Sequence, residues 1–281
     1  MTQWRKGIAS WKVGKTLYQS IPFTWLLPQA EAAAREHKGP VVAGGPAVKL
    51  MGAPWAETPQ TVPYDTLSFH NPLATFTTRG CPNRCEFCAV PKVEGDFREL
   101  TSWKPAPVIC DNNLLAGTQG HFYSVMESLK QFPYADFNQG LEARRFKFFH
   151  ADVLRSLKAV KIRFAFDHPQ QETVVHDAIE LCRRFGLNDL GVYCLIGWND
   201  TPETARERMD LVRSWGIRPN AMRYQPLDVL VKNSYVSPAW TEAELLKTMH
   251  YYNHLRWYEH IPFDEFNRTD YPEDNQEVLP L

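Results

Sequence analysis

The chain has 281 residues, 44% of them hydrophobic, and its 31 Lys and Arg residues nearly balance its 32 Asp and Glu residues. This length is enough to bury one large core, and the formal net charge of -1 excludes a global basic field of the kind that binds nucleic acid. No run is long and apolar enough for a membrane span, and the first residues lack the apolar stretch of a secretory signal. We therefore expect a cytoplasmic protein with no membrane contact.

The first 72 residues predict a small N-terminal βαβ appendage and a linker. Residues 17–24 read as a strand, residues 26–37 contain strong helix formers, and a second strand is expected at residues 40–43. Prolines are frequent in residues 49–71, which is typical of a linker.

Residues 9–16, with the sequence ASWKVGKT, satisfy the loosest phosphate-loop pattern, which would allow a nucleotide hydrolase. A functional phosphate loop needs a buried strand before it and a helix after it. Only eight residues precede this segment, and a strand is expected to follow it. We therefore interpret the pattern as a chance match.

Strands and helices alternate from residue 73 onward, which indicates parallel β-α-β units. The expected strands are residues 73–78, 106–110, 134–138, 161–166, 190–196 and 221–224. The expected helices are residues 118–132, 151–160, 172–185, 202–215 and 242–258. The predicted fold class is α/β, with a partial (β/α)6 TIM-type barrel over residues 73–230 and a C-terminal helix and tail over residues 231–281. The segment 89–105 is short and contains proline, so the first barrel helix should be missing or broken.

Three of the six cysteines, Cys81, Cys85 and Cys88, form a C-x-x-x-C-x-x-C motif, and the other three are scattered. Three thiolates on one loop can ligate three irons of a [4Fe–4S] cluster, where ordinary electron-transfer clusters take four cysteines. The fourth iron is then open, as in catalytic metal sites. A zinc site remains as an alternative, although the nearest further ligands, His70 and Cys110, make no standard spacing. Incidental core cysteines are a second alternative.

The motif and its flanks, TRGCP and FCAVP, resemble the radical S-adenosylmethionine (SAM) superfamily over about residues 73–228. Residues 109–113 (ICDNN) and 193–203 are similar to the second- and fifth-strand motifs of the branch that holds cobalamin-binding enzymes and methylthiotransferases. The resemblance implies that the open iron binds SAM and that reductive cleavage of SAM yields a 5′-deoxyadenosyl radical. This radical abstracts hydrogen from a substrate.

The resemblance and the strand-end positions together suggest residues that contact SAM, although no catalytic side chain is assigned. The expected SAM contacts are Phe87, Asp111, Asn112, Asn113, Gly197, Tyr224 and Gln225. Three further residues, Gln139, Arg144 and Asp167, are expected to face the same cavity and to contact SAM or substrate. For each polar residue the alternative is helix capping or an ordinary polar loop.

Several partners and cofactors follow from the same comparison. Cobalamin is not expected, because its Asp-x-His-x-x-Gly motif is absent, and neither is sulfur insertion, because no second cysteine cluster is visible. A low-potential electron donor such as flavodoxin or ferredoxin is implied. We expect a polar small-molecule or nucleoside-like substrate. A tRNA- or DNA-modifying enzyme is the alternative if the arginines gather on one face, and a non-catalytic metal-binding module is a second alternative; these arginines are at positions 144, 145, 183, 184, 206 and 208.

Overall fold

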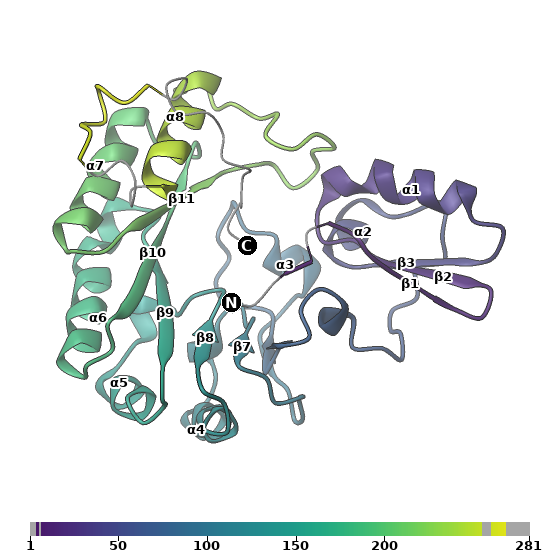
Figure 1. Cartoon of the computed structure of the whole chain (residues 1–281), viewed down its shortest axis with the longest axis horizontal. Coiled ribbons are helices and arrows are strands. Elements are labelled where there is room, and N and C mark those ends of the chain that lie inside the picture. The colour runs from purple at the N-terminus through teal and green to yellow at the C-terminus, as the bar shows by residue number, and fades with distance from the viewer. Residues whose placement is uncertain (1–3, 6, 255–259, 268–281) are drawn as a thin grey trace.

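The computed structural model describes residues 4–5, 7–254 and 260–267. Its larger unit is a mixed α/β structure around a six-stranded parallel sheet (Figure 1). In the order in which they pair, the strands are β4 (Ala74–Thr75), β7 (Val108–Ile109), β8 (Ala135–Phe137), β9 (Val160–Ala165), β10 (Asp189–Ile196) and β11 (Pro219–Arg223). Strand order therefore follows chain order, and the sheet is open, with β4 and β11 as its two edges.

Because the sheet is wound in one direction, its connecting helices cover one face (Figure 1). These helices are α4 (Gln119–Leu129), α5 (Phe148–Leu154), α6 (Glu172–Arg184) and α7 (Pro202–Ser214), and α8 (Glu242–Asn253) follows β11. Thr201 is the N-cap of α7: its hydroxyl accepts a hydrogen bond from the backbone N–H of Thr204 at 3.3 Å. The expected extension of the last helix to residue 258 runs into residues 255–259, which lie outside the described part of the chain.

In strand β9, side chains alternate between the face that the helices cover and the opposite face, which we call the inner face of the sheet. Val160, Ile162 and Phe164 are buried against the helices, and full burial of such a side chain stabilises the fold by about 1.5–3 kcal/mol. Lys161 and Ala165 alternate with them and are exposed. A small exposed side chain on a central strand means that the inner face is open to solvent at this level.

Several elements begin or end at residues other than the predicted ones. The expected helix 151–160 is α5, which begins earlier and ends at Leu154, because the chain turns before entering β9 at Val160. The expected strand 73–78 is divided into β4 and β5 (Thr78–Arg79), and β5 pairs with β6 (Arg98–Glu99) instead of the main sheet.

The first crossover carries no barrel helix of normal length in the described structure, as expected. Between β4 and β7 it contains β5, the single turn α3 (Val90–Val93) and β6. The cysteine motif occupies this crossover, between β5 and α3. Its conformation therefore depends on contacts other than those of a long helix.

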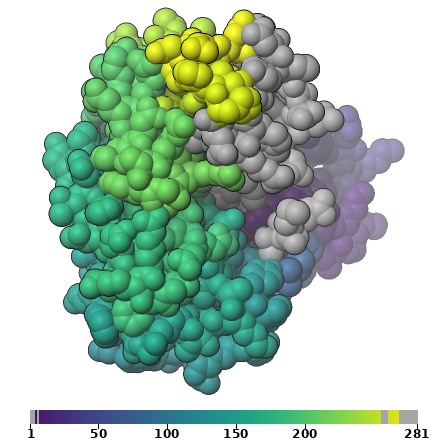
Figure 2. Space-filling view, turned by 60° about the vertical axis from the view of Figure 1, so that its left-hand side comes forward, coloured from purple at the N-terminus to yellow at the C-terminus, as the bar shows by residue number. Residues whose placement is uncertain are grey.

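The N-terminal unit is a three-stranded sheet with two helices on the far side of the main sheet from α4–α7 (Figures 1 and 2). Its elements are β1 (Ala9–Val13), β2 (Thr16–Ser20), α1 (Leu27–Glu36), β3 (Val41–Gly44) and α2 (Pro46–Met51). The βαβ prediction missed β1 and α2, and the expected linker contains the end of α2 and the short helix η2 (Thr66–Phe69).

The phosphate-loop pattern falls on the β1–β2 hairpin. Gly14 and Lys15 form its turn, with Gly14 at a φ of 58°, and the strands pair in antiparallel fashion. A phosphate loop connects a strand to a helix, so this segment has the wrong architecture for one. The interpretation as a chance match is confirmed.

The N-terminal unit contacts the segments that follow the two edge strands of the open sheet. Lys49 Nζ on α2 donates to the carbonyl of Val93 on α3 at 3.1 Å, and the Thr24 hydroxyl donates to the carbonyl of Val229, beyond β11, at 2.6 Å. The unit therefore spans from the crossover that holds the cysteines to the segment after the last strand. None of the helices in the described residues combines the length and apolar character of a membrane span.

Candidate metal centre

The three cysteines of the motif lie together on one loop. Cys81 is buried, Cys88 is half-buried and Cys85 is exposed, and the backbone N–H of Cys88 donates to the carbonyl of Cys85 at 3.0 Å. Burial raises the pKa of both Cys85 and Cys88, and the charge on Cys81 raises it further in each case. The three sulfurs therefore lie within electrostatic reach of one another.

The scattered cysteines have a different environment. Cys110, Cys182 and Cys194 are at most 2% exposed, and burial raises the pKa of each to about 12. A thiol of this kind behaves as a small apolar side chain. The motif cysteines are the ones with access to a ligand.

Asp111 at the end of β7 holds the strand that leads into the cysteine loop. Its carboxylate accepts the backbone N–H groups of Thr77 at 2.6 Å and Thr78 at 2.9 Å, together with the Thr77 hydroxyl. Burial raises the pKa of Asp111, and these hydrogen bonds oppose the rise. Both oxygens therefore have protein partners, and the expected contact of Asp111 with SAM stays a prediction.

A second set of polar side chains, His121 and Glu99, connects to Thr77. His121 Nε2 lies 3.3 Å from the Thr77 hydroxyl, and its Nδ1 lies 3.8 Å from a carboxylate oxygen of Glu99 on β6. The order of groups resembles a nucleophile, a base and an acid, but Thr77 is fully buried. The arrangement therefore supports the loop instead of attacking a substrate.

Glu94 clamps the loop from the other side. Its carboxylate accepts the Gly80 backbone N–H at 2.8 Å and the Asn112 side-chain amide at 2.9 Å, and it pairs with Arg79 at 2.8 Å. Gly80 has a φ of 72°, and a Cβ there would lie 2.2 Å from the carbonyl oxygen of Asp96. Glycine is required directly before Cys81 because no other residue fits.

Two buried asparagines present polar atoms that have no protein partner. Asn113, 2% exposed, places Nδ2 at 3.5 Å from Cys81 Sγ and leaves Oδ1 unpartnered. Asn138, 4% exposed, leaves Nδ2 unpartnered at the end of β8. Buried polar groups are normally hydrogen-bonded, so these two atoms suit a bound ligand that carries both donors and acceptors.

The ends of β8 and β9 bring charged groups to the cysteines. Glu142 pairs with Arg144 at 2.6 Å and accepts the side-chain amide of Asn83, within the motif, at 2.6 Å. Arg144 stabilises the charged form of Cys85, whereas Asp167 opposes it. Burial raises the pKa of Asp167, whose carboxylate accepts the backbone N–H of Leu195 at 3.0 Å.

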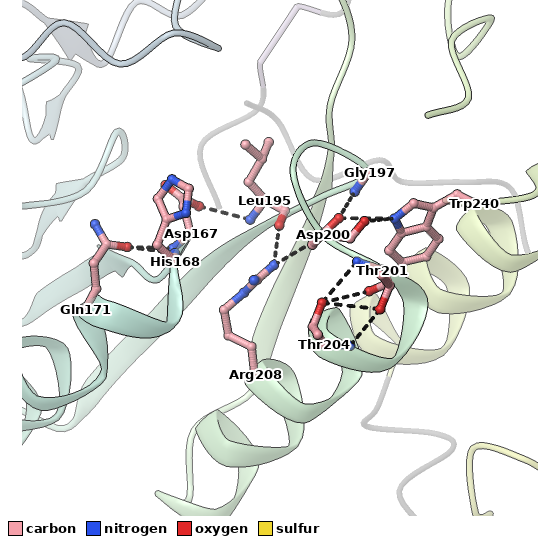
Figure 3. A network of polar contacts seen from close by, with 10 residues as sticks. All are labelled: Asp167, His168, Gln171, Leu195, Gly197, Asp200, Thr201, Thr204, Arg208 and Trp240. Atoms are coloured by element: carbon pink, nitrogen blue, oxygen red, sulfur yellow. Dashed lines mark hydrogen bonds and ion pairs between the residues drawn. The ribbon is translucent and has the colours of Figure 1, made fainter. Parts of the chain in front are cut away.

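The loop between β10 and α7 is held by Asp200 (Figure 3). This carboxylate accepts the backbone N–H of Gly197 at 2.9 Å, pairs with Arg208 at 2.9 Å and accepts Trp240 Nε1 at 3.1 Å. Arg208 also donates to the carbonyl of Leu195 at 2.5 Å, and both members of the ion pair are buried. Gly197 therefore occupies a preorganised turn at the end of β10.

An aromatic row crosses the same edge of the sheet. The rings of Phe87 and Trp198 meet edge to face at 6.4 Å between centroids, Trp198 and Tyr224 lie 4.4 Å apart, and Tyr224 and Tyr235 lie 5.3 Å apart. The row joins the cysteine loop to the segment after β11. Aromatic faces of this kind can pack against a planar ring.

The expected site residues therefore divide into three groups. Phe87 lies on the cysteine loop, and Asn113, Arg144 and Asp167 have contacts or charges that connect them to its cysteines. Asp111, Asn112 and Gln225 have side chains bound to protein groups; Gln225 exchanges hydrogen bonds with Asn233. The remaining three, Gln139, Gly197 and Tyr224, lie at the same edge of the sheet, with Gln139 exposed.

Sequence reasoning missed several residues that shape the site. Trp198 directly follows Gly197, so its position next to an expected contact was a usable signal. Glu94 and Asn138 carried no local signal, because their partners come from other elements.

The donor set on this loop consists of three thiols, the ligand type of iron–sulfur clusters. In the part of the chain that the structure describes, no three His, Cys, Asp or Glu side chains converge on one point. A zinc ion draws four ligands to a single centre, whereas each thiolate of a cubane cluster binds a different iron and the sulfurs lie farther apart. The thiol donors and the unpartnered amide oxygen of Asn113 are compatible with a cluster that carries a further ligand.

The arginines that would build a nucleic-acid track are largely paired. Arg144, Arg183, Arg206 and Arg208 each form an ion pair with a carboxylate, and Arg208 is buried. Two surface hollows, of about 620 and 530 Å³, lie on α7 and on α4 and α5 instead of at the cysteine loop.

No protein-family model matches this chain, and no curated protein is similar to it in sequence.

Proposed function

We propose that the protein is a radical SAM enzyme whose Cys81, Cys85 and Cys88 hold a [4Fe–4S] cluster. The observation that carries the proposal is the position of three free thiols on one loop, one of them exposed, at the carboxyl edge of an open parallel sheet that is wound in one direction. In this proposal the sheet is a partial (β/α)6 barrel, and ligands bind where its strands end.

The chain's own residues would bind and orient the reactants. Glu94 and Asp111 hold the loop backbone, so the thiols are positioned before any ligand binds. The unpartnered atoms of Asn113 and Asn138 suit the polar groups of SAM, and Phe87 and Trp198 suit its adenine ring. When bound, the cluster and SAM would supply a one-electron cleavage of the S–C5′ bond and hence hydrogen abstraction. A low-potential donor such as flavodoxin or ferredoxin would supply the electron.

The inner face of the sheet favours a polar small-molecule or nucleoside-like substrate. Arg163 on β9 pairs with Asp136 on β8, and the Tyr193 hydroxyl donates to the carbonyl of Asn138 at 3.1 Å. The charges of Arg163 and Asp136 balance each other, whereas a nucleic-acid backbone would need several unpaired cations. Sub-micromolar tRNA or single-stranded DNA binding at physiological salt would contradict this substrate class.

Anaerobic reconstitution of the full chain tests the proposal. The wild type should load about four irons and four sulfides and, once reduced, convert SAM slowly to 5′-deoxyadenosine. Replacing any motif cysteine with alanine should abolish loading, and Cys182→Ala, in the core, should load normally. Normal loading by all three motif variants would overturn the cluster assignment, and a colourless zinc protein would establish the metal-binding module instead.

A further inference from the structure

The side chain of Asn113 contacts a cysteine sulfur from a separate element of the fold. Asn113 follows β7 and caps the short helix η3 (Leu114–Ala116), whereas Cys81 lies on the crossover loop. Asn113 Nδ2 is 3.5 Å from Cys81 Sγ, and both residues are buried. The contact is therefore shielded from water, which would otherwise compete for the sulfur.

The orientation of the amide follows from the chemistry of a ligated cysteine. A thiolate accepts hydrogen bonds and has no proton to donate, so the NH2 group must face the sulfur and the oxygen must face away. The oxygen, Asn113 Oδ1, has no partner in the protein. Its backbone position, fixed between β7 and η3, holds the donor next to Cys81.

We propose that Asn113 raises the reduction potential of the cluster through this N–H···S hydrogen bond. The inference rests on the proposed function. Reduction adds negative charge to the cluster and its thiolates, and a donor aimed at a thiolate stabilises that charge. The effect is strong in a buried environment, where the local dielectric constant is low. Asn113 thus acts on the cluster through the Cys81 sulfur and is not itself a ligand.

At the other two sulfurs, a side-chain substitution cannot remove the hydrogen bond. Cys88 is hydrogen-bonded by the backbone of Val90, which a side-chain substitution does not remove. Cys85 is exposed, so water can hydrogen-bond it in any variant. The Asn113 amide is the donor that a single isosteric substitution can delete.

A redox titration of the reconstituted full chain, followed by electron paramagnetic resonance without SAM, tests this role. In Asn113→Leu, the ratio of reduced to oxidised cluster at a fixed potential should fall about tenfold, which is about 59 mV for a one-electron couple. The matched control is Asn188→Leu, outside the cysteine loop, whose exposed amide donates to the carbonyl of Gly186 at 3.3 Å and not to a sulfur. The control should keep the wild-type midpoint.

A second measurement keeps the test decisive if Asn113→Leu fails to load iron. Wild-type protein labelled with 15N in its asparagine side chains should show a weak nitrogen coupling to the reduced cluster, and Asn188→Leu should retain it. An unchanged midpoint in a loaded Asn113→Leu variant, or no coupling in the wild type, would overturn the role of Asn113. Failure of the wild type to bind iron would instead overturn the proposed function, and the iron content shows this first.

Discussion

At the scale of single residues, the cysteine loop depends on carboxylates that never touch a sulfur. Glu94 satisfies an arginine, a backbone N–H next to Cys81 and the Asn112 amide at once, while its own side chain is only 10% exposed. A buried carboxylate with three donors is costly to alter, since each donor left unpaired loses its solvation as well as its bond. The loop geometry should therefore be sensitive to this one side chain.

Glu94→Gln should reduce iron loading and lower the free energy of unfolding by about 1–3 kcal/mol, because the amide brings two N–H groups toward existing donors. Iron content after reconstitution and urea denaturation measure the two effects. Glu86→Gln is the matched control, since Glu86 is exposed on the same loop and should change neither quantity. Equal loading and stability in both variants would mean that the clamp does not hold the loop.

At the scale of elements, helix α5 begins with a pH-sensitive cap. The backbone N–H of Lys147 donates to His150 Nδ1 at 2.9 Å, so the imidazole must be neutral to accept it. Burial, and secondarily the charge on Lys147, lowers the pKa of His150 from 6.5 to about 4. The unfolded chain therefore binds this proton more readily than the folded chain does between these two values.

The free energy of unfolding should consequently fall as pH is lowered from about 6.5 to about 4, because the proton must be taken up by the unfolded state. His150→Asn retains an acceptor near the Nδ1 position but has no proton to gain, so it should flatten this slope. Urea denaturation at several pH values compares the two proteins. A slope as steep in the variant as in the wild type would assign the pH dependence to other groups.

At the scale of the whole molecule, the N-terminal unit connects the segments that follow the two edge strands of a sheet that does not close on itself. The Thr24 hydroxyl is buried and reaches the carbonyl of Val229 beyond β11, and α2 packs near α3 beside the cysteine loop. The unit thus braces both ends of the open sheet. Removing one of these contacts should therefore increase local opening in the segments on both sides of it.

Thr24→Val keeps the shape of the side chain but removes its donor, leaving the Val229 carbonyl unpaired at a cost of about 1 kcal/mol or more. Hydrogen exchange should quicken in residues 224–240 and in the N-terminal unit. Thr101→Val replaces an exposed threonine in the first crossover and should leave exchange in both regions unchanged. Wild-type exchange in Thr24→Val would show that this contact does not couple the two units.

The sequence by itself determined the alternation of strands and helices and the cysteine motif, because each depends on local periodicity or spacing. Val160, Ile162 and Phe164 alternate as a strand with one buried face, and the predicted and observed elements overlap there. Thr201, Pro202 and Gly216 lie at the two ends of α7, and capping signals of this kind are also local in sequence.

Only the tertiary structure decided which polar residues at the strand ends are free. Asp111 and Asn113 lie two positions apart in one motif, yet Asp111 is bound to Thr77 and Thr78 and Asn113 keeps an unpartnered oxygen beside Cys81. The pattern could not separate them, because their partners come from a different crossover. Hydrogen-bond satisfaction depends on atoms that are distant in sequence, and these meet only when the elements pack together.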